Sequence, residues 1–229
     1  ADPLFIGGIA ASPYEMGKTL ADQAIEAGDK TAVVLGAAIG DYSHDQRIAG
    51  FTEEFESKGG KVLQTMHCSD PSESTTKAND LVMANPDVDA VYCSGGDYLS
   101  AVAAIKAGDS YKFDLYGTDV APDLIDYIEQ GVIQAMNGGN HVNGAISLCL
   151  LVNYLDGHQI LDADGNVEFN YPDPGFFTNS DLLAGNSTDN YLRKVYRDYT
   201  LNFDQCNVME EVLKILPDKA DMILDAAGI

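Results

Sequence analysis

Short apolar runs alternate with helix-like segments over the first 138 residues of the chain. The runs TAVVLGA, KVLQTMHC, AVYC, FDLYG and VIQAM each have about the length of one strand, and amphipathic helical patterns separate them. TAVVLGA is apolar throughout, as expected for a strand that is buried on both faces. Strands that alternate with helices indicate βαβ units and a parallel sheet. The pattern therefore predicts an α/β fold with a doubly wound, mostly parallel five-stranded sheet.

The first helix has the clearest boundaries. Ser12 is placed as its N-cap, Pro13 as its first helical residue and Glu15 as the capping-box partner. Gly28 is expected to end it. A loop, AIGDYSHD, is predicted to lead into the next helix, which covers QRIAGFTEEFESKGG.

The pattern changes after Met136. A turn rich in glycine and asparagine, NGGNHVNG, precedes a long apolar helix, AISLCLLVNYLDG. HQILDADGNVEFNY is predicted to form two strands around a hairpin turn at Asp164-Gly165, and PDPGFFTNSDLLAGNSTDN is predicted to be rich in loops. Helical patterns follow to the C-terminus, so we expect residues 139–229 to form a C-terminal α/β extension of residues 1–138.

Two turns that contain glycine and aspartate follow successive predicted strands. Gly95-Gly96-Asp97 comes after AVYC, and Gly117-Thr118-Asp119 comes at the end of FDLYG. In open α/β sheets, ligands bind outside the carboxyl ends of the strands, which makes these turns a candidate binding site. The alternative is that glycine and aspartate merely suit tight turns and helix N-caps.

Composition narrows the classes of function. With a net charge of −23 the chain repels phosphate backbones, so we expect no nucleic-acid partner. No apolar run approaches the roughly 20 residues of a membrane span, and the N-terminus lacks the features of a signal peptide. The sequence has no nucleophile elbow, no phosphate-binding loop and no histidine pair at metal spacing, which argues against an enzyme, a cofactor and a metal site.

The four cysteines have no metal-ligand spacing, and we interpret them mainly as small buried hydrophobic residues: Cys68, Cys93, Cys149 and Cys206.

The order of several short motifs along the chain is informative. They are G-K-x-x-A-D in the first helix, R-x-x-G-F in the second, N-P-D-V-D-A-V-Y, Y-G-T-D before a proline helix, and G-V-I-x-A. In this order the chain resembles the type I periplasmic solute-binding proteins of the ribose- and galactose-binding group. The effector domains of lac-type repressors share that fold. The resemblance covers residues 8 to about 157, and it implies two similar lobes, joined by a three-strand hinge, that clamp a ligand between them.

The resemblance also implies a domain organisation and a role. Residues 1–138 correspond to the C-terminal lobe of that family, and residues 139–229 correspond to elements that return to the N-terminal lobe, followed by a tail. Most of the N-terminal lobe has no counterpart, so we expect this chain to be a fragment. The implied function is the binding component of a bacterial ABC-type uptake system for a sugar or polyol, in the periplasm or outside the cell, with a membrane permease as partner. The alternative is the effector-sensing domain of a lac-type transcription regulator.

A homodimer is also expected, because loss of a lobe would expose the apolar face of AISLCLLVNYL.

Arg47 and Asp119 are the leading site residues under this resemblance. The arginine of R-x-x-G-F donates to ligand hydroxyls or a carboxylate in sugar-binding relatives, and a guanidinium offers five donors in a fixed fork. The aspartate of Y-G-T-D accepts hydrogen bonds from paired sugar hydroxyls. The alternatives are a surface salt bridge for Arg47 and helix capping for Asp119.

Five further positions are weaker candidates. Gly96 stands where sugar binders often carry asparagine, and Asp97 beside it suits a helix N-cap better than a ligand contact. Asn137 and His141 lie near the position of a glutamine in the relatives, although both types also serve in turns. Tyr42 lies in the loop before the arginine and is a candidate lining residue of a cleft.

Overall fold

The computed structural model describes most of the first 138 residues and two short strands beyond them. The chain divides into two compact units, one formed by Ser12–Gly138 with Pro174–Asp189 and the other by the remaining segments. The described residues are 8–9, 12–108, 111–119, 122–138, 169–170 and 175–178.

The larger unit is built on a six-stranded sheet with the order β3-β2-β4-β5-β6-β8. The first five strands in this order are parallel, which confirms the predicted five-stranded parallel α/β sheet, and β8 adds an antiparallel edge. β8 lies in the passage that was predicted to be rich in loops, so that prediction was wrong for its four residues. The strands are β2 (Thr31–Gly36), β3 (Lys61–His67), β4 (Ala90–Cys93), β5 (Asp114–Thr118), β6 (Ala135–Gly138) and β8 (Gly175–Thr178).

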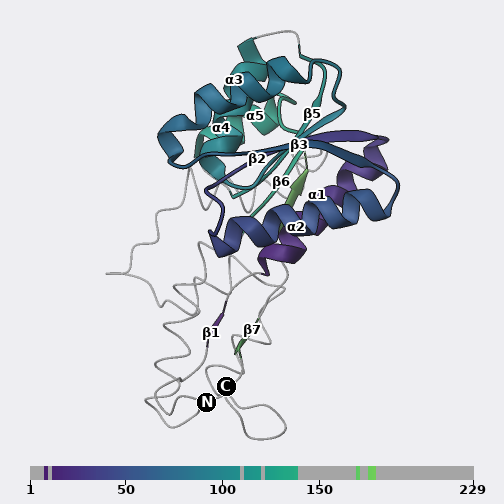
Figure 1. Ribbon diagram of the computed structural model, residues 1–229, viewed down its shortest axis with the longest axis vertical. Coiled ribbons are helices and arrows are strands. Elements are labelled where there is room, and N and C mark those ends of the chain that lie inside the picture. Colours follow the sequence, from purple (N-terminus) through teal and green to yellow (C-terminus); the bar gives the residue numbers. More distant parts are fainter. Residues whose placement is uncertain are drawn as a thin grey trace, which may run out of the picture. The chain divides into compact units, whose positions relative to one another are not determined.

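Helices cover both faces of this sheet. Figure 1 shows α1 and α2 together on one face, with α3, α4 and α5 on the other. The change of face occurs where β2 and β4 lie side by side, because β2 leads through α2 to β3 whereas β3 leads back through α3 to β4. This is the topological switch point of the sheet. The helices are α1 (Pro13–Ala27), α2 (Tyr42–Ser57), the 3-10 turn η1 (Pro71–Glu73), α3 (Ser74–Ala84), α4 (Gly96–Gly108) and α5 (Pro122–Glu129).

The ends of α1 follow the prediction. The Ser12 hydroxyl accepts a hydrogen bond from the Glu15 backbone N–H at 3.4 Å, and Pro13 is the first helical residue. Gly28 ends the helix with a φ of 103°, a left-handed conformation that suits glycine. Local capping chemistry therefore sets both ends of α1.

Two other boundaries differ from the prediction. α2 begins at Tyr42, one turn earlier than expected, because the Asp41 carboxylate caps it by accepting the His44 N–H at 3.3 Å. β6 begins three residues later than the run VIQAM suggested. Gly131 has a φ of 74° at the end of α5, and the strand starts only at Ala135. The turn residue Asn137 is consequently part of a strand.

The helices α1 and α2 approach each other at two glycines. A Cβ atom on Gly17 would lie 1.9 Å from the Arg47 carbonyl oxygen, and one on Gly50 would lie 2.0 Å from the Tyr14 carbonyl oxygen. Beneath this crossing the Phe51 ring stacks on the Tyr92 ring of β4, with 4.3 Å between ring centroids. The close crossing fixes α2, and with it Arg47, against the sheet.

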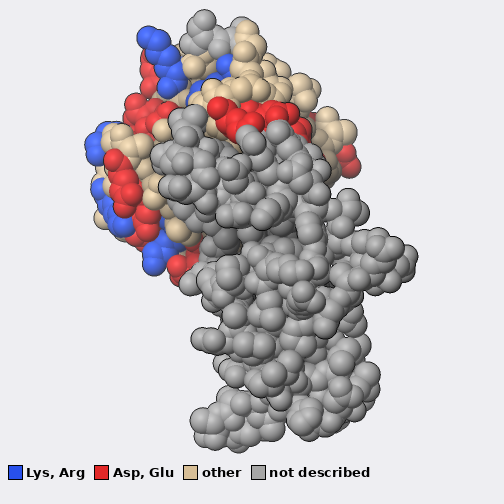
Figure 2. Space-filling view, turned by 180° about the vertical axis from the view of Figure 1, so that it is seen from behind, with Lys and Arg blue, Asp and Glu red and all other residues tan. Residues whose placement is uncertain are grey.

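The chain carries 36 Asp and Glu residues against 13 Lys and Arg residues. Figure 2 shows Asp and Glu side chains gathered in a band across the described part of one face, with Lys and Arg toward its upper and left margins. No helix among the described residues is long and apolar enough to cross a membrane.

The smaller unit contributes one described strand pair. β1 (Gly8–Ile9) pairs in parallel with β7 (Phe169–Asn170). The predicted helix AISLCLLVNYLDG, the Asp164-Gly165 hairpin turn and the C-terminal helices lie outside the described residues.

Candidate functional site

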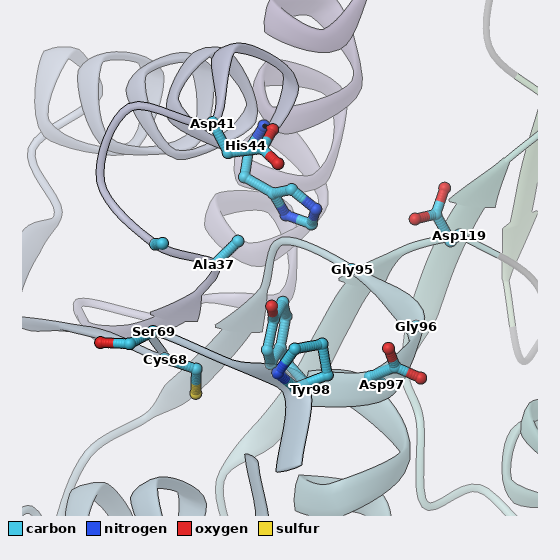
Figure 3. Close-up of a pocket in the computed structure, with 12 residues that line it drawn as sticks. Ala37, Asp41, His44, Cys68, Ser69, Gly95, Gly96, Asp97, Tyr98 and Asp119 are labelled. Atoms are coloured by element: carbon cyan, nitrogen blue, oxygen red, sulfur yellow. Dashed lines mark hydrogen bonds between the residues drawn. The ribbon is translucent and has the colours of Figure 1, made fainter. Parts of the chain in front are cut away.

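A pocket of about 290 Å³ opens at the carboxyl ends of the strands, at the switch point between β2 and β4. It is formed by the turns that follow four neighbouring strands, which is where ligands bind in sheets of this type. Figure 3 shows the carboxyl groups of Asp97 and Asp119 and the ring of His44 around the turn at Gly95 and Gly96. The lining residues are Ala37, Ala38, Asp41, His44, Cys68, Ser69, Pro71, Gly95, Gly96, Asp97, Tyr98 and Asp119.

Arg47 and Asp119 form a two-pronged ion pair at the edge of this pocket. Arg47 Nη1 donates to Asp119 Oδ2 at 3.0 Å, and Nη2 donates to Oδ1 at 3.2 Å. Nη1 also donates to the backbone oxygen of Ser94 at 2.9 Å. The Arg47 side chain is 7% exposed and that of Asp119 is 39% exposed. Arg47 therefore lies behind Asp119, and only the carboxylate faces the pocket.

The Asp119 backbone adopts an unusual conformation. Its φ of 78° is the one positive φ at a non-glycine position among the described residues. Aspartate tolerates this left-handed region better than most residues, and the Asp119 N–H donates to the Asn137 carbonyl at 2.8 Å. The turn after β5 thus aims the carboxylate at the Arg47 fork.

A hydrogen-bonded group centred on Ser94 supports the same wall. Ser94 is fully buried, and its hydroxyl lies 2.9 Å from His44 Nδ1. The His44 ring packs edge-on against the Tyr98 ring at 5.7 Å, and a Cβ on Gly95 would lie 2.6 Å from His44 Cε1. Burial, and secondarily the charge of Arg47, lowers the pKa of His44. The ring is therefore uncharged at neutral pH.

The predicted site residues fall into two groups in the structure. Gly96, Asp97 and Asp119 line the pocket. Asp97 lies inside the first turn of α4, which begins at Gly96, so it is not the N-cap that the sequence favoured. Arg47 is buried, so the alternative of a surface salt bridge does not hold. Tyr42 is 72% exposed at the start of α2, outside the pocket lining.

The Asn137 side chain is buried and makes a contact within the fold. It is fully buried, and its side-chain nitrogen donates to the Met16 carbonyl of α1 at 2.7 Å. Among the described residues, its Oδ1 atom has no hydrogen-bond partner. Asn137 thus fixes the end of β6 to α1, and it is not among the residues that line this pocket. The other candidate of this turn, His141, lies outside the described residues.

Sequence reasoning missed Ser94 and Tyr98. Both flank the Gly95-Gly96 turn, so their proximity to the end of a predicted strand was the available signal. Cys68 and Cys93 are buried, as predicted; both are free thiols, and burial raises the pKa of both. Among the described residues, no group of three or more His, Cys, Asp or Glu side chains is placed to hold a metal ion.

Comparison with known proteins agrees with the family resemblance of the sequence. Residues 7–159 match the family model for the periplasmic binding protein domain. No curated protein matches the chain. The fold resembles that of an ABC transporter periplasmic solute binding protein from Actinobacillus succinogenes 130z with bound D-allose. The two are 17% identical with a TM-score of 0.66, and the match covers 76% of this chain and 62% of that one.

Two further solved structures are similar. AraP, an arabinose binding protein from Geobacillus stearothermophilus, is 18% identical with a TM-score of 0.67, covering 79% of this chain and 66% of that one. An ABC transporter solute binding protein from Burkholderia graminis C4D1M, in complex with D-arabinose, is 18% identical with a TM-score of 0.67, covering 78% and 64%. The chain thus spans less than two thirds of each of these proteins. The matched family and these structures are binding proteins and not enzymes, in agreement with the prediction.

Proposed function

The chain belongs to the family of periplasmic binding protein domains, and on this basis we propose that it is the ligand-binding component of a bacterial ABC-type uptake system for a sugar or polyol. Two of the similar structures named above are solute binding proteins with bound D-allose or D-arabinose, and the third is an arabinose binding protein, which supports a sugar as the ligand class. Its place of action is the periplasm or the outer side of the cell membrane, where a membrane permease receives the ligand.

The Asp119 carboxylate is the observation that carries this proposal. An ionised carboxylate only accepts hydrogen bonds, at about four lone-pair positions, and the Arg47 fork uses two of them. The remaining positions face the pocket, where they suit the paired hydroxyl donors of a sugar. Because the buried guanidinium holds the carboxylate in place, a ligand meets an acceptor that is already oriented.

In this proposal the larger unit is the C-terminal lobe of a two-lobed clamp, and residues 139–229, apart from Pro174–Asp189 in the larger unit, contribute elements that return to the other lobe. The ligand would shift an equilibrium between open and closed forms by binding the closed form better, and the permease would recognise that form. A chain that lacks most of one lobe would then bind weakly, because half of the ligand contacts are absent.

Thermal-shift measurements test the proposal. The 229-residue chain and the product of the complete gene are each melted with a panel of neutral pentoses, hexoses and polyols that includes D-allose and D-arabinose. A ligand at a hundred times its Kd stabilises the native state by about 2.7 kcal/mol, which raises the Tm of a chain of this length by roughly 5–10 °C. We expect a response from at least one sugar, larger for the complete gene product.

Two variants test whether the thermal response depends on the charge of Asp119. Asp119→Asn keeps the shape of the side chain but loses the charge, and it should abolish the response. Asp80→Asn, which removes an exposed charge from α3 away from the pocket lining, should leave the response unchanged. Silence from every sugar and polyol, or a response that Asp119→Asn leaves intact, would refute the proposed function.

A further inference from the structure

The charged side chains that line the pocket are all carboxylates. Asp41 caps α2, Asp97 lies in the first turn of α4, and Asp119 follows β5, so three separate elements each contribute one. Figure 3 shows the carboxyl groups of Asp97 and Asp119 on either side of the Gly96 turn. Among the described residues, no lysine or arginine side chain lines the pocket. The described wall therefore carries three negative charges and no positive one.

The guanidinium nearest to the pocket, that of Arg47, already donates its hydrogen bonds to other protein groups. Both terminal nitrogens of Arg47 donate to the Asp119 carboxylate, and one of them also donates to the Ser94 carbonyl. The side chain is only 7% exposed. An anionic ligand could reach the Arg47 guanidinium only by displacing the Asp119 carboxylate. The displaced carboxylate would then lie beside the ligand as a like charge. Arg47 thus orients an acceptor and does not offer a binding site for anions.

The N-termini of α2 and α4 at the pocket already have carboxylates beside them. The N-terminus of a helix attracts anions through its free N–H groups and its dipole. The Asp41 carboxylate already accepts the His44 N–H at the start of α2, and Asp97 places a second negative charge in the first turn of α4. Burial lowers the pKa of His44, which favours the uncharged form of its ring at neutral pH.

Taken with the function proposed above, on which this step rests, the geometry points to selection of the ligand by charge. We propose that the pocket binds polyhydroxylated ligands that are neutral or carry an ammonium group, and that it rejects those that carry a carboxylate or phosphate. Hydroxyl and ammonium groups donate hydrogen bonds to carboxylates, whereas a ligand carboxylate is a like charge that cannot donate.

The test uses sugars that differ in charge at one carbon only. Binding of D-galactose, D-galacturonate and 6-amino-6-deoxy-D-galactose, and of the three corresponding glucose compounds, is measured by calorimetry with the complete gene product and with this chain. We expect the Kd of each uronate to be at least about tenfold weaker than that of its neutral parent, and the Kd of each amino sugar to be equal or tighter. Raising the salt from about 0.05 M to about 0.5 M should shrink both differences.

A variant that lacks one pocket charge tests whether the pocket carboxylates cause the discrimination between uronate and neutral sugar. Asp97→Asn should reduce the discrimination between uronate and neutral sugar by about threefold, whereas Asp80→Asn on α3 should leave it unchanged. If the neutral sugars bind but the uronates bind as tightly, charge selection is overturned and the proposed function survives. If none of the six compounds binds and the wider neutral panel is also silent, the proposed function falls and the charge selection falls with it. If a different neutral sugar responds, its own uronate and amino derivatives replace the galactose series.

Discussion

The ion pair between Arg47 and Asp119 allows a quantitative test, because its two members differ in exposure. The Arg47 side chain is 7% exposed and that of Asp119 is 39% exposed. Asp119→Asn leaves a buried guanidinium without its anion, and breaking a fully buried pair in this way costs about 3–5 kcal/mol. Because water reaches Asp119 and asparagine can still accept one hydrogen bond, we expect a smaller loss of about 2 kcal/mol in the free energy of unfolding. Asparagine also tolerates the positive φ of this position.

A double-mutant cycle separates the pair from other effects. Arg47→Met removes the charge and keeps an apolar stem, and in that background Asp119→Asn should cost less than about 0.5 kcal/mol. The coupling free energy is therefore about 1.5 kcal/mol, measured by urea unfolding of the four proteins at constant pH and salt. Asp97→Asn serves as the control and should change stability by less than about 0.5 kcal/mol. If Asp119→Asn costs the same with and without Arg47, the carboxylate is not held by the guanidinium and the reasoning fails.

Two further predictions concern stability away from the pocket. Burial raises the pKa of Asp29 from 3.8 to about 6, although a hydrogen bond from the Tyr116 hydroxyl at 2.9 Å opposes the rise. The folded state then binds more protons than the unfolded state between these values, so stability falls by up to about 3 kcal/mol as pH rises from 4 to 7, and Asp29→Asn should remove this loss in urea titrations across that range. Gly50→Ala should cost about 3 kcal/mol or more, because its Cβ would meet the Tyr14 carbonyl at 2.0 Å. Gly108→Ala, where no atom of the described residues lies within 4 Å of the added Cβ, should change the unfolding midpoint little, and equal effects of the two substitutions would contradict this account.

Local sequence signals predicted much of the larger unit. The capping residues Ser12 and Gly28 fixed the ends of α1, and the run AVYC coincides with β4. These features depend on short-range chemistry, which a single sequence displays directly. The order of the motifs also placed Arg47 and Asp119 near the carboxyl end of the sheet, although nothing in the residues showed that they pair with each other across 72 positions.

The errors have physical causes at the level of tertiary structure. Asn137 was expected in an exposed turn because the run VIQAM suggested that the strand ended before it. The left-handed Gly131 and the residues after it delay the strand, so Asn137 becomes its third residue and donates to α1. Tyr42 was assigned to a loop because the capping role of Asp41 was overlooked. β8 pairs only with a distant strand, and no local pattern marks such pairing.

The conformation of Asp119 connects the fold to the proposed function. A non-glycine residue in the left-handed region costs about 1–2 kcal/mol, and such residues persist only where their surroundings determine the backbone. Here the Asn137 carbonyl binds the Asp119 N–H and the Arg47 fork binds its carboxylate, so both ends of the residue are fixed by residues that do not themselves line the pocket. The cost of orienting the acceptor is therefore met during folding and not when a ligand arrives. A ligand then spends little of its binding free energy on ordering this wall, which is the property that a binding protein requires of a site at the end of a rigid sheet.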